Sequence, residues 1–204
     1  MKRSKIGENM YREWGEDSCR QELWDAIKLI EHDAPAGAQE LENLSKRGSA
    51  LSMMWLGHAL FVGRYGLEKD AVAGEKWLRK SAECGSIEGL YALARLLRDS
   101  GRDAEAMGLF KQAAELGYSP AMFCAGWGYY FGLGADRDID SAYEYFKKAA
   151  DAGHLYGTVW ESYTFRKRKK NAITWIRNLL IRVPLVFRVT YALITYPSSD
   201  RLRK

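Results

Sequence analysis

The sequence is poor in the residues that build metal sites and disulfide frameworks. Only three of its 204 residues are cysteine and only three are histidine. Cys19, Cys84 and Cys124 show no Cys-x-x-Cys spacing, and no two histidines stand four residues apart, as a helical zinc site requires. We therefore expect no metal and no cofactor. The odd number of cysteines indicates reduced thiols, and the repeat positions of Cys84 and Cys124 predict small apolar side chains.

The sequence also lacks the motifs of secretion and of catalysis. The N-terminal segment has a basic start but no apolar stretch behind it, so we expect a cytoplasmic protein. Gly132 and Gly134 form a Gly-x-Gly pair without a preceding strand, which disfavours a phosphate loop. Asp136, Asp138 and Asp140 alternate as in a calcium loop, but the required glycine and glutamate do not follow. We predict a protein that is not an enzyme and has no small-molecule substrate.

What the chain does contain is three consecutive segments that resemble each other. They are Gly48–Cys84, Gly85–Leu116 and Gly117–Ala152. Each opens on a glycine, continues through a segment rich in aromatic residues and alanine, and closes on a second amphipathic segment. A period of 30 to 40 residues with two helices is typical of an α-solenoid. We predict an all-α fold of antiparallel helix pairs that stack on their neighbours to bury their apolar faces.

Glycines and alanines set the register of these repeats. A small residue recurs nine residues after each opening glycine and would let the second helix approach the first closely. Another glycine ends each second helix, where a left-handed residue caps the last carbonyl groups. The small residues are Gly57, Ala94 and Gly126, and the helix-ending glycines are Gly85, Gly117 and Gly153.

The third repeat carries a family resemblance. Residues Ala125–Gly153 read AGWGYYFGLGADRDIDSAYEYFKKAADAG and resemble a nearly complete Sel-one-like repeat, a relative of the tetratricopeptide repeat. Leu56–Gly85 matches the same pattern with one inserted residue, whereas the middle repeat has a shortened loop at Asp99–Glu105. The resemblance implies an adaptor or assembly scaffold without catalytic residues of its own.

The flanking segments complete the predicted domain organisation. We expect a polar tail over residues 1–16, a degenerate helix pair over 17–47, a closing half-repeat over 153–165 and a basic amphipathic segment over 166–204. This last segment has 11 lysine and arginine residues against one acidic residue. Since the whole chain carries a net charge of +5, the rest of the chain is acidic.

The basic segment has an apolar part, residues 172–196, that is nominally long enough to span a bilayer. Arg177, Arg182 and Arg188 argue against spanning, because each costs roughly 2.5–3.5 kcal/mol near the middle of a membrane helix. We predict a helix lying on an anionic membrane surface. A packed cap on the solenoid and a seam for oligomers or partners are the alternatives, and nucleic acid is disfavoured by the acidic repeats. The predicted contact residues are Arg166, Lys167, Arg168, Lys169, Lys170, Trp175, Arg177, Leu180 and Arg182.

The family resemblance also implies a binding groove, because first helices line the concave face of such solenoids. Side chains that vary between repeats at this face are rich in the residue types that protein interfaces favour. The alternative is that part of them only packs one repeat on the next. The predicted groove residues are Met53, Trp55, His58, Leu90, Arg95, Met122 and Trp127. We expect a scaffold or adaptor for a protein partner; the alternative is a regulatory subunit of an envelope or polysaccharide assembly enzyme.

Overall fold

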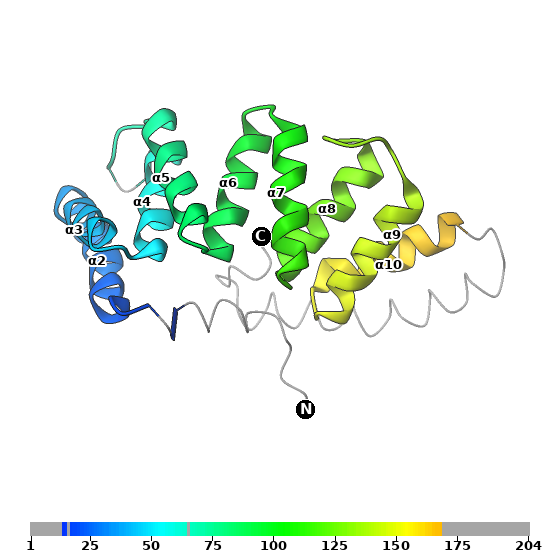
Figure 1. The fold of residues 1–204 in the computed structure, drawn as a ribbon, viewed down its shortest axis with the longest axis horizontal. Helices are drawn as coiled ribbons and strands as arrows, with labels where there is room; N and C mark the ends of the chain where they lie inside the picture. Colours follow the sequence, from blue (N-terminus) through cyan, green and yellow to red (C-terminus); the bar gives the residue numbers. More distant parts are fainter. Residues whose placement is uncertain (1–13, 16, 65, 169–204) are drawn as a thin grey trace. The chain divides into compact units, whose positions relative to one another are not determined.

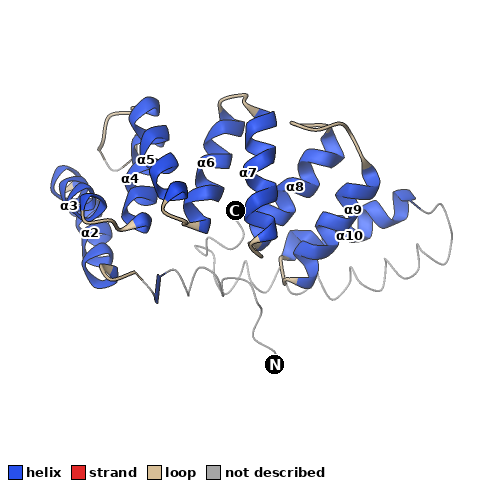
Figure 2. Ribbon diagram, viewed as in Figure 1, coloured by secondary structure: helices blue, strands red, loops and turns tan. Residues whose placement is uncertain are grey.

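The computed structural model describes residues 14–15, 17–64 and 66–168, and within these ranges the chain forms nine helices and no strand (Figures 1 and 2). The predicted all-α solenoid class is confirmed. The predictions for Lys169, Lys170, Trp175, Arg177, Leu180 and Arg182 concern residues outside the described ranges. The helices are α2 (Arg20–His32), α3 (Ala34–Lys46), α4 (Ala50–Val62), α5 (Ala71–Glu83), α6 (Ile87–Asp99), α7 (Asp103–Glu115), α8 (Ser119–Phe131), α9 (Ile139–Asp151) and α10 (Leu155–Arg168).

The chain divides into two compact units. Among the described residues, the first ends at Leu116 and contains α2 to α7; the second begins at Gly117 and contains α8 to α10. In the first unit α2 pairs with α3, α4 with α5 and α6 with α7, and further contacts join α3 to α4, α5 to α6 and α4 to α6. In the second unit α9 packs against both α8 and α10. Successive pairs thus share apolar surface, as a repeat that cannot fold alone requires.

The predicted glycines end the second helices. A glycine directly follows the C-cap residue of α5, α7 and α9. These glycines are Gly85, Gly117 and Gly153, and their φ angles are 86°, 87° and 85°. A side chain strains the backbone in this left-handed region, so glycine is the favoured residue there. The amide of Gly85 donates to the carbonyl oxygen of Ala82, which satisfies one of the last carbonyl groups of α5.

Small residues allow the two helices of a repeat to cross closely, as predicted. A Cβ atom on Gly57 of α4 would lie 2.9 Å from the carbonyl oxygen of Gly74 in α5. A Cβ atom on Gly74 would in turn lie 2.8 Å from the carbonyl oxygen of Gly57. In the second unit, a Cβ atom on Gly126 would lie 2.8 Å from the ring of Phe146. Gly74 belongs to this crossing although the repeat pattern did not single it out.

The core is apolar, and it corrects one prediction for the cysteines. Leu23, Leu41 and Leu44 are fully buried in the first unit, together with the buried thiol of Cys19. Cys84, which was expected to pack as a small apolar side chain, is exposed. It follows the last residue of α5, whose buried face consists of Gly74, Leu78 and Ser81.

The first helices of repeats 1 and 2 and helix α10 of the closing half-repeat begin with a side-chain cap at the same register. Ser49 accepts a hydrogen bond from the amide of Ser52 at 3.1 Å, and Ser86 accepts one from Gly89 at 2.9 Å. At the start of α10, the Nδ1 atom of His154 accepts a hydrogen bond from the amide of Gly157 at 3.1 Å. Each cap satisfies an amide that the helix itself leaves unpaired.

The side chain of His154, which caps α10, is also buried. Its imidazole is only 6% exposed and stacks on the ring of Phe123, with a centroid distance of 4.8 Å. Burial lowers the pKa of His154 to about 4, because the charged imidazolium loses its hydration in this apolar setting. The neutral ring is therefore the form that can accept the hydrogen bond from Gly157.

A network of four charged side chains joins α5 to the start of α7 in the first unit. Arg79 contacts both Glu75 and Glu105 at 2.7 Å. Arg102 contacts Glu75 at 2.8 Å and Glu105 at 2.5 Å. Burial alone would raise the pKa of Glu75, but its hydrogen bonds from Arg79 and Arg102 outweigh this and lower the pKa. The second helices of repeats 1 and 2 are thereby linked through alternating charges.

Candidate protein-binding face and cationic pocket

The predicted groove residues of α4 in the first unit are partly core. Met53 is 7% exposed and therefore belongs to the core rather than to the surface of α4. Trp55 and His58 are half-buried. Trp55 packs against the apolar core of the first unit, and its indole Nε1 is buried without a hydrogen-bond partner among the described residues. This arrangement makes Trp55 a packing residue that is only partly exposed.

The predicted groove residues of α6 present a mixed surface. Leu90 and Arg95 are both half-buried. The guanidinium group of Arg95 lies 5.8 Å from the centroid of the Tyr91 ring, which is itself buried. Such a cation held over an aromatic ring combines charge with a flat apolar surface. Leu90 and Arg95 therefore combine an apolar surface with a positive charge that is held over an aromatic ring.

In the second unit, Trp127 is at the centre of an aromatic cluster. Its ring centroid lies 4.7 Å from that of Phe131, 4.6 Å from that of Trp160 and 5.8 Å from that of Phe123. We call Phe123, Trp127, Phe131 and Trp160 the aromatic cluster. Phe131 is 48% exposed and the other three rings are half-buried. The remaining predicted groove residue, Met122, is half-buried on the same helix, α8.

The sequence reasoning missed Trp160 and Tyr163, although the repeat register contains both. Trp160 follows the opening Gly153 by the same number of residues as Trp55 follows Gly48. Tyr163 likewise stands at the register of Trp127. Extending the repeat alignment through α10 would have placed both residues on the first-helix face.

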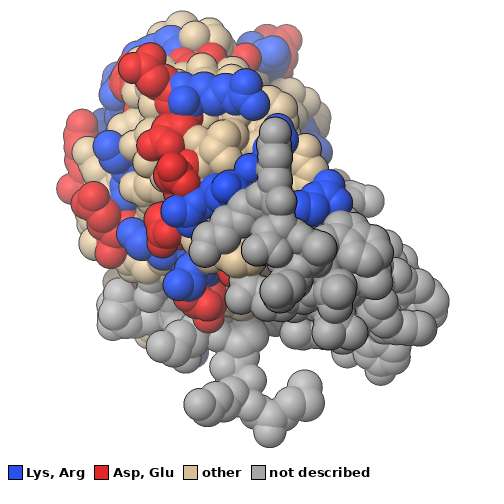
Figure 3. Space-filling model, turned by 90° about the vertical axis from the view of Figure 1, so that its right-hand side faces the viewer, with Lys and Arg blue, Asp and Glu red and all other residues tan. Residues whose placement is uncertain are grey.

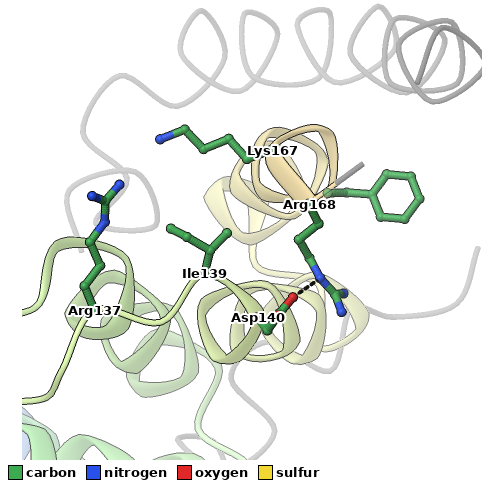
Figure 4. A pocket seen from close by; sticks show the side chains of 6 residues that line it. Arg137, Ile139, Asp140, Lys167 and Arg168 are labelled. Atoms are coloured by element: carbon green, nitrogen blue, oxygen red, sulfur yellow. Dashed lines mark ion pairs between the residues drawn. The ribbon is translucent and has the colours of Figure 1, made fainter. Parts of the chain in front are cut away.

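A pocket of about 680 Å³ opens beside the end of α10 in the second unit. Figure 4 shows Arg137 and Lys167 extending on the same side of Ile139, while Arg168 turns toward Asp140. Arg168 forms an ion pair with Asp140 and a longer one, at 3.6 Å, with Glu144. Its guanidinium group also lies 4.5 Å from the centroid of the Tyr143 ring. The pocket is lined by Arg137, Ile139, Asp140, Phe165, Lys167 and Arg168.

Tyr130 connects this pocket with the aromatic cluster. Lys167 donates a hydrogen bond to the Tyr130 hydroxyl at 2.6 Å, and Arg137 donates through Nε to the Tyr130 carbonyl oxygen at 3.2 Å. The ring of Tyr130 lies 4.8 Å from that of Phe131 and 5.1 Å from that of Trp160. Burial would raise the pKa of Tyr130, but its hydrogen bonds with Lys167 and Tyr163 outweigh this and lower the pKa. The cations and the exposed ring of Phe131 therefore lie on either side of Tyr130 in the second unit.

The basic residues predicted to touch a membrane begin inside α10. The helix extends three residues beyond the predicted closing half-repeat, to Arg168. Lys167 and Arg168 contact tyrosine rings of the second unit, and Arg166 lies 5.8 Å from the centroid of Tyr163. In the space-filling view of Figure 3, lysine and arginine side chains gather near the centre of the face shown, with acidic side chains along one side. None of the helices in the described part of the chain is long and apolar enough to cross a membrane.

The repeats match a family model. The model of the Sel1 repeat matches residues 50–86, 87–118 and 119–154, which together are more than half of the chain. The chain belongs to the Sel1 repeat family. Each match starts two residues after the opening glycine of the predicted repeat, so the predicted succession of three repeats is the succession that the family model finds. Sel1 repeats generally serve in interactions between proteins.

Solved structures share this fold. A Sel1 repeat protein from Oxalobacter formigenes is 17% identical with a TM-score of 0.69, and the match covers 82% of this chain and 73% of that protein. A protective antigen of uropathogenic Escherichia coli with an SLR fold is 19% identical with a TM-score of 0.64. That match covers 73% of this Sel1 repeat chain but only 33% of the antigen, so the chain spans a third of its length.

Proposed function

We propose that this Sel1 repeat protein is a non-catalytic scaffold that binds a protein partner through the side chains of its first helices. The aromatic cluster supplies the main contact. Tryptophan and other large aromatic residues contribute much of the binding free energy at protein interfaces, since they bury a large area with few rotatable bonds. The membership of the Sel1 repeat family supports the same class of function.

The observation that carries this proposal is the packing of Trp127. Its ring contacts three other aromatic rings, so its orientation is fixed before any partner arrives. A side chain that is already ordered loses little conformational entropy on binding. Phe131, beside it, exposes nearly half of its surface and is available for contact. An ordered cluster with an exposed edge is suited to a recurring protein contact.

The proposal is tested by the double variant Trp127→Ala/Phe131→Ala. We expect it to weaken the binding of co-purifying protein partners by about 2–4 kcal/mol, because truncation of interface aromatics commonly costs this much. Quantitative mass spectrometry of proteins captured by the intact chain identifies the partners, and titration of the purified partner measures the affinity. Circular dichroism checks that the variant remains folded.

Trp24→Ala is the matched control. Trp24 lies on α2, is 49% exposed and contacts Trp14 at a centroid distance of 6.2 Å. Its loss removes an exposed aromatic ring without touching the aromatic cluster, so partner binding should stay at the wild-type level. Equal losses in the control and the double variant would show that general exposed apolar surface, rather than this cluster, holds the partner.

A further inference from the structure

We propose that the pocket between Arg137 and Lys167 binds a carboxylate group from an acidic segment of the protein partner, next to the aromatic cluster. This inference rests on the proposed scaffold function and names the chemistry of the bound segment: an aspartate or glutamate close in sequence to an apolar or aromatic residue. The apolar residue would contact the exposed edge of Phe131, and the carboxylate would enter the pocket.

The charges of the pocket are only partly compensated by the protein. Of its three cations, Arg168 has carboxylate partners in Asp140 and Glu144. Arg137 and Lys167 have no carboxylate within 4.0 Å among the described residues. The hydrogen bond to Tyr130 raises the pKa of Lys167, whereas the nearby charge of Arg137 works in the opposite direction. An anion placed between the two cations would therefore gain attraction from both and relieve their repulsion.

The donor groups suit a carboxylate. Arg137 uses its Nε for the Tyr130 carbonyl oxygen, so the two terminal nitrogens of its guanidinium group remain for a ligand. A guanidinium group and a carboxylate match in their planar geometry, and hydrogen bonds between ionised groups are about twice as strong as neutral ones. Lys167 is fixed by Tyr130 and offers further N–H groups as a point charge. Figure 4 shows both side chains on the same side of Ile139.

The rim of the pocket favours one inserted carboxylate over a continuous anionic surface. The side chains of Asp140 and Glu144 are 71% and 57% exposed beside the pocket. A bilayer of anionic headgroups approaching this rim would meet both carboxylates, which repel it. A single acidic side chain needs to meet only Arg137 and Lys167, which extend on the other side of Ile139 from the Arg168–Asp140 ion pair. We therefore assign the site to a protein segment rather than to a membrane.

The experiment selects ligands without assuming their sequence. A library of random 12-residue peptides displayed on phage is selected on the immobilised full chain and, in parallel, on the full-chain variant Arg137→Gln/Lys167→Gln. The control variant Arg64→Gln/Lys76→Gln removes two exposed cations of the first unit and so changes the net charge equally. One selected peptide is then synthesised with its acidic residues intact and with each replaced by the matching amide, and its affinity is measured by fluorescence anisotropy.

Peptides selected on the wild-type and control chains should be enriched in aspartate and glutamate near an apolar residue, and this enrichment should disappear on Arg137→Gln/Lys167→Gln. The synthesised peptide should bind that variant at least about 10-fold more weakly, as expected for the loss of a charge-assisted contact. Acidic enrichment that persists on the pocket variant would overturn the inference. The inference would also be overturned if Arg137→Gln/Lys167→Gln bound phosphatidylglycerol vesicles more weakly than the wild type but bound the peptide with unchanged affinity, because the pocket would then recognise a membrane.

The two proposals fail in different ways. If peptides bind in a manner that depends on Trp127 and Phe131 but not on Arg137 and Lys167, the scaffold function stands and the carboxylate site is refuted. If peptide binding depends on the pocket cations but not on the two aromatic residues, the aromatic cluster loses its role while the pocket keeps its assignment. Circular dichroism of every variant confirms that these comparisons involve folded chains.

Discussion

Replacing His154 by serine should remove a pH-dependent part of the stability of the second unit. Serine stands at this register in repeats 1 and 2, where Ser49 and Ser86 cap their helices, so the variant keeps a capping side chain at the start of α10. What the variant loses is an imidazole that is buried and has a pKa lowered to about 4. Its pH profile should therefore differ from that of the wild type.

The sign follows from the two states of the histidine. In the unfolded chain His154 takes up a proton near pH 6.5, whereas in the folded protein it does so only near pH 4. Between these values the unfolded state binds more protons, so acidification favours unfolding. At about 1.4 kcal/mol per pKa unit, the wild type should lose about 3 kcal/mol relative to His154→Ser between pH 7 and pH 4.

Urea unfolding of both proteins at a series of pH values measures this difference. Carboxylates also titrate in this range, but they do so in both proteins and cancel in the comparison. The loss of ring stacking on Phe123 shifts the variant by a constant amount and leaves the pH profile unchanged. His32→Ser, at an exposed histidine of α2, is the control and should follow the wild type. Parallel wild-type and His154→Ser profiles from pH 7 to pH 4 would refute the reasoning.

Two further predictions concern the helix crossing and the C-terminal segment. Gly57→Ala should lower the free energy of unfolding by roughly 1–3 kcal/mol, because its Cβ atom would press on the backbone of Gly74. Gly108→Ala, which meets open space on α7, should raise it by about 0.4–1 kcal/mol, and similar urea midpoints for the two variants would contradict the close crossing. The intact chain should co-sediment with anionic liposomes, less so as salt rises, and neutralising Arg166, Lys169 and Lys170 should remove about 1 kcal/mol of binding per charge. Equal sedimentation with neutral and anionic liposomes would count against membrane attachment.

The features that the sequence predicts correctly are those set by local geometry and repetition. Gly85, Gly117 and Gly153 end helices because a left-handed residue is required at that position in every repeat. Gly57 and Gly126 permit close packing because the helix period places them on the inner face in each repeat. The prediction for Cys84 was wrong because an alignment with apolar residues does not show whether a residue just beyond the end of a helix is buried.

The pocket could not be predicted from the sequence, because its lining residues are distant in sequence and because the sequence does not distinguish the roles of its basic residues. Arg137 lies in the loop before α9, and Lys167 lies in the last turn of α10. In the sequence, Arg166, Lys167 and Arg168 form a single basic run. A helix turns about 100° per residue, so the three side chains point in different directions and meet different partners. Only the fold assigns Arg168 to Asp140 and Lys167 to Tyr130.

The charge network between α5 and α7 depends on the order in which the repeats follow each other. Glu75 and Arg79 come from repeat 1, while Arg102 and Glu105 come from repeat 2. At the corresponding register, repeat 3 has Asp138 in place of Arg102 and Ser141 in place of Glu105. If repeat 3 followed repeat 1 directly, an acidic residue would face Glu75 and Arg79 would lose one of its two partners. The units that look interchangeable in the alignment are therefore specific for their neighbours, and permuted or duplicated repeats would need new charges at each junction.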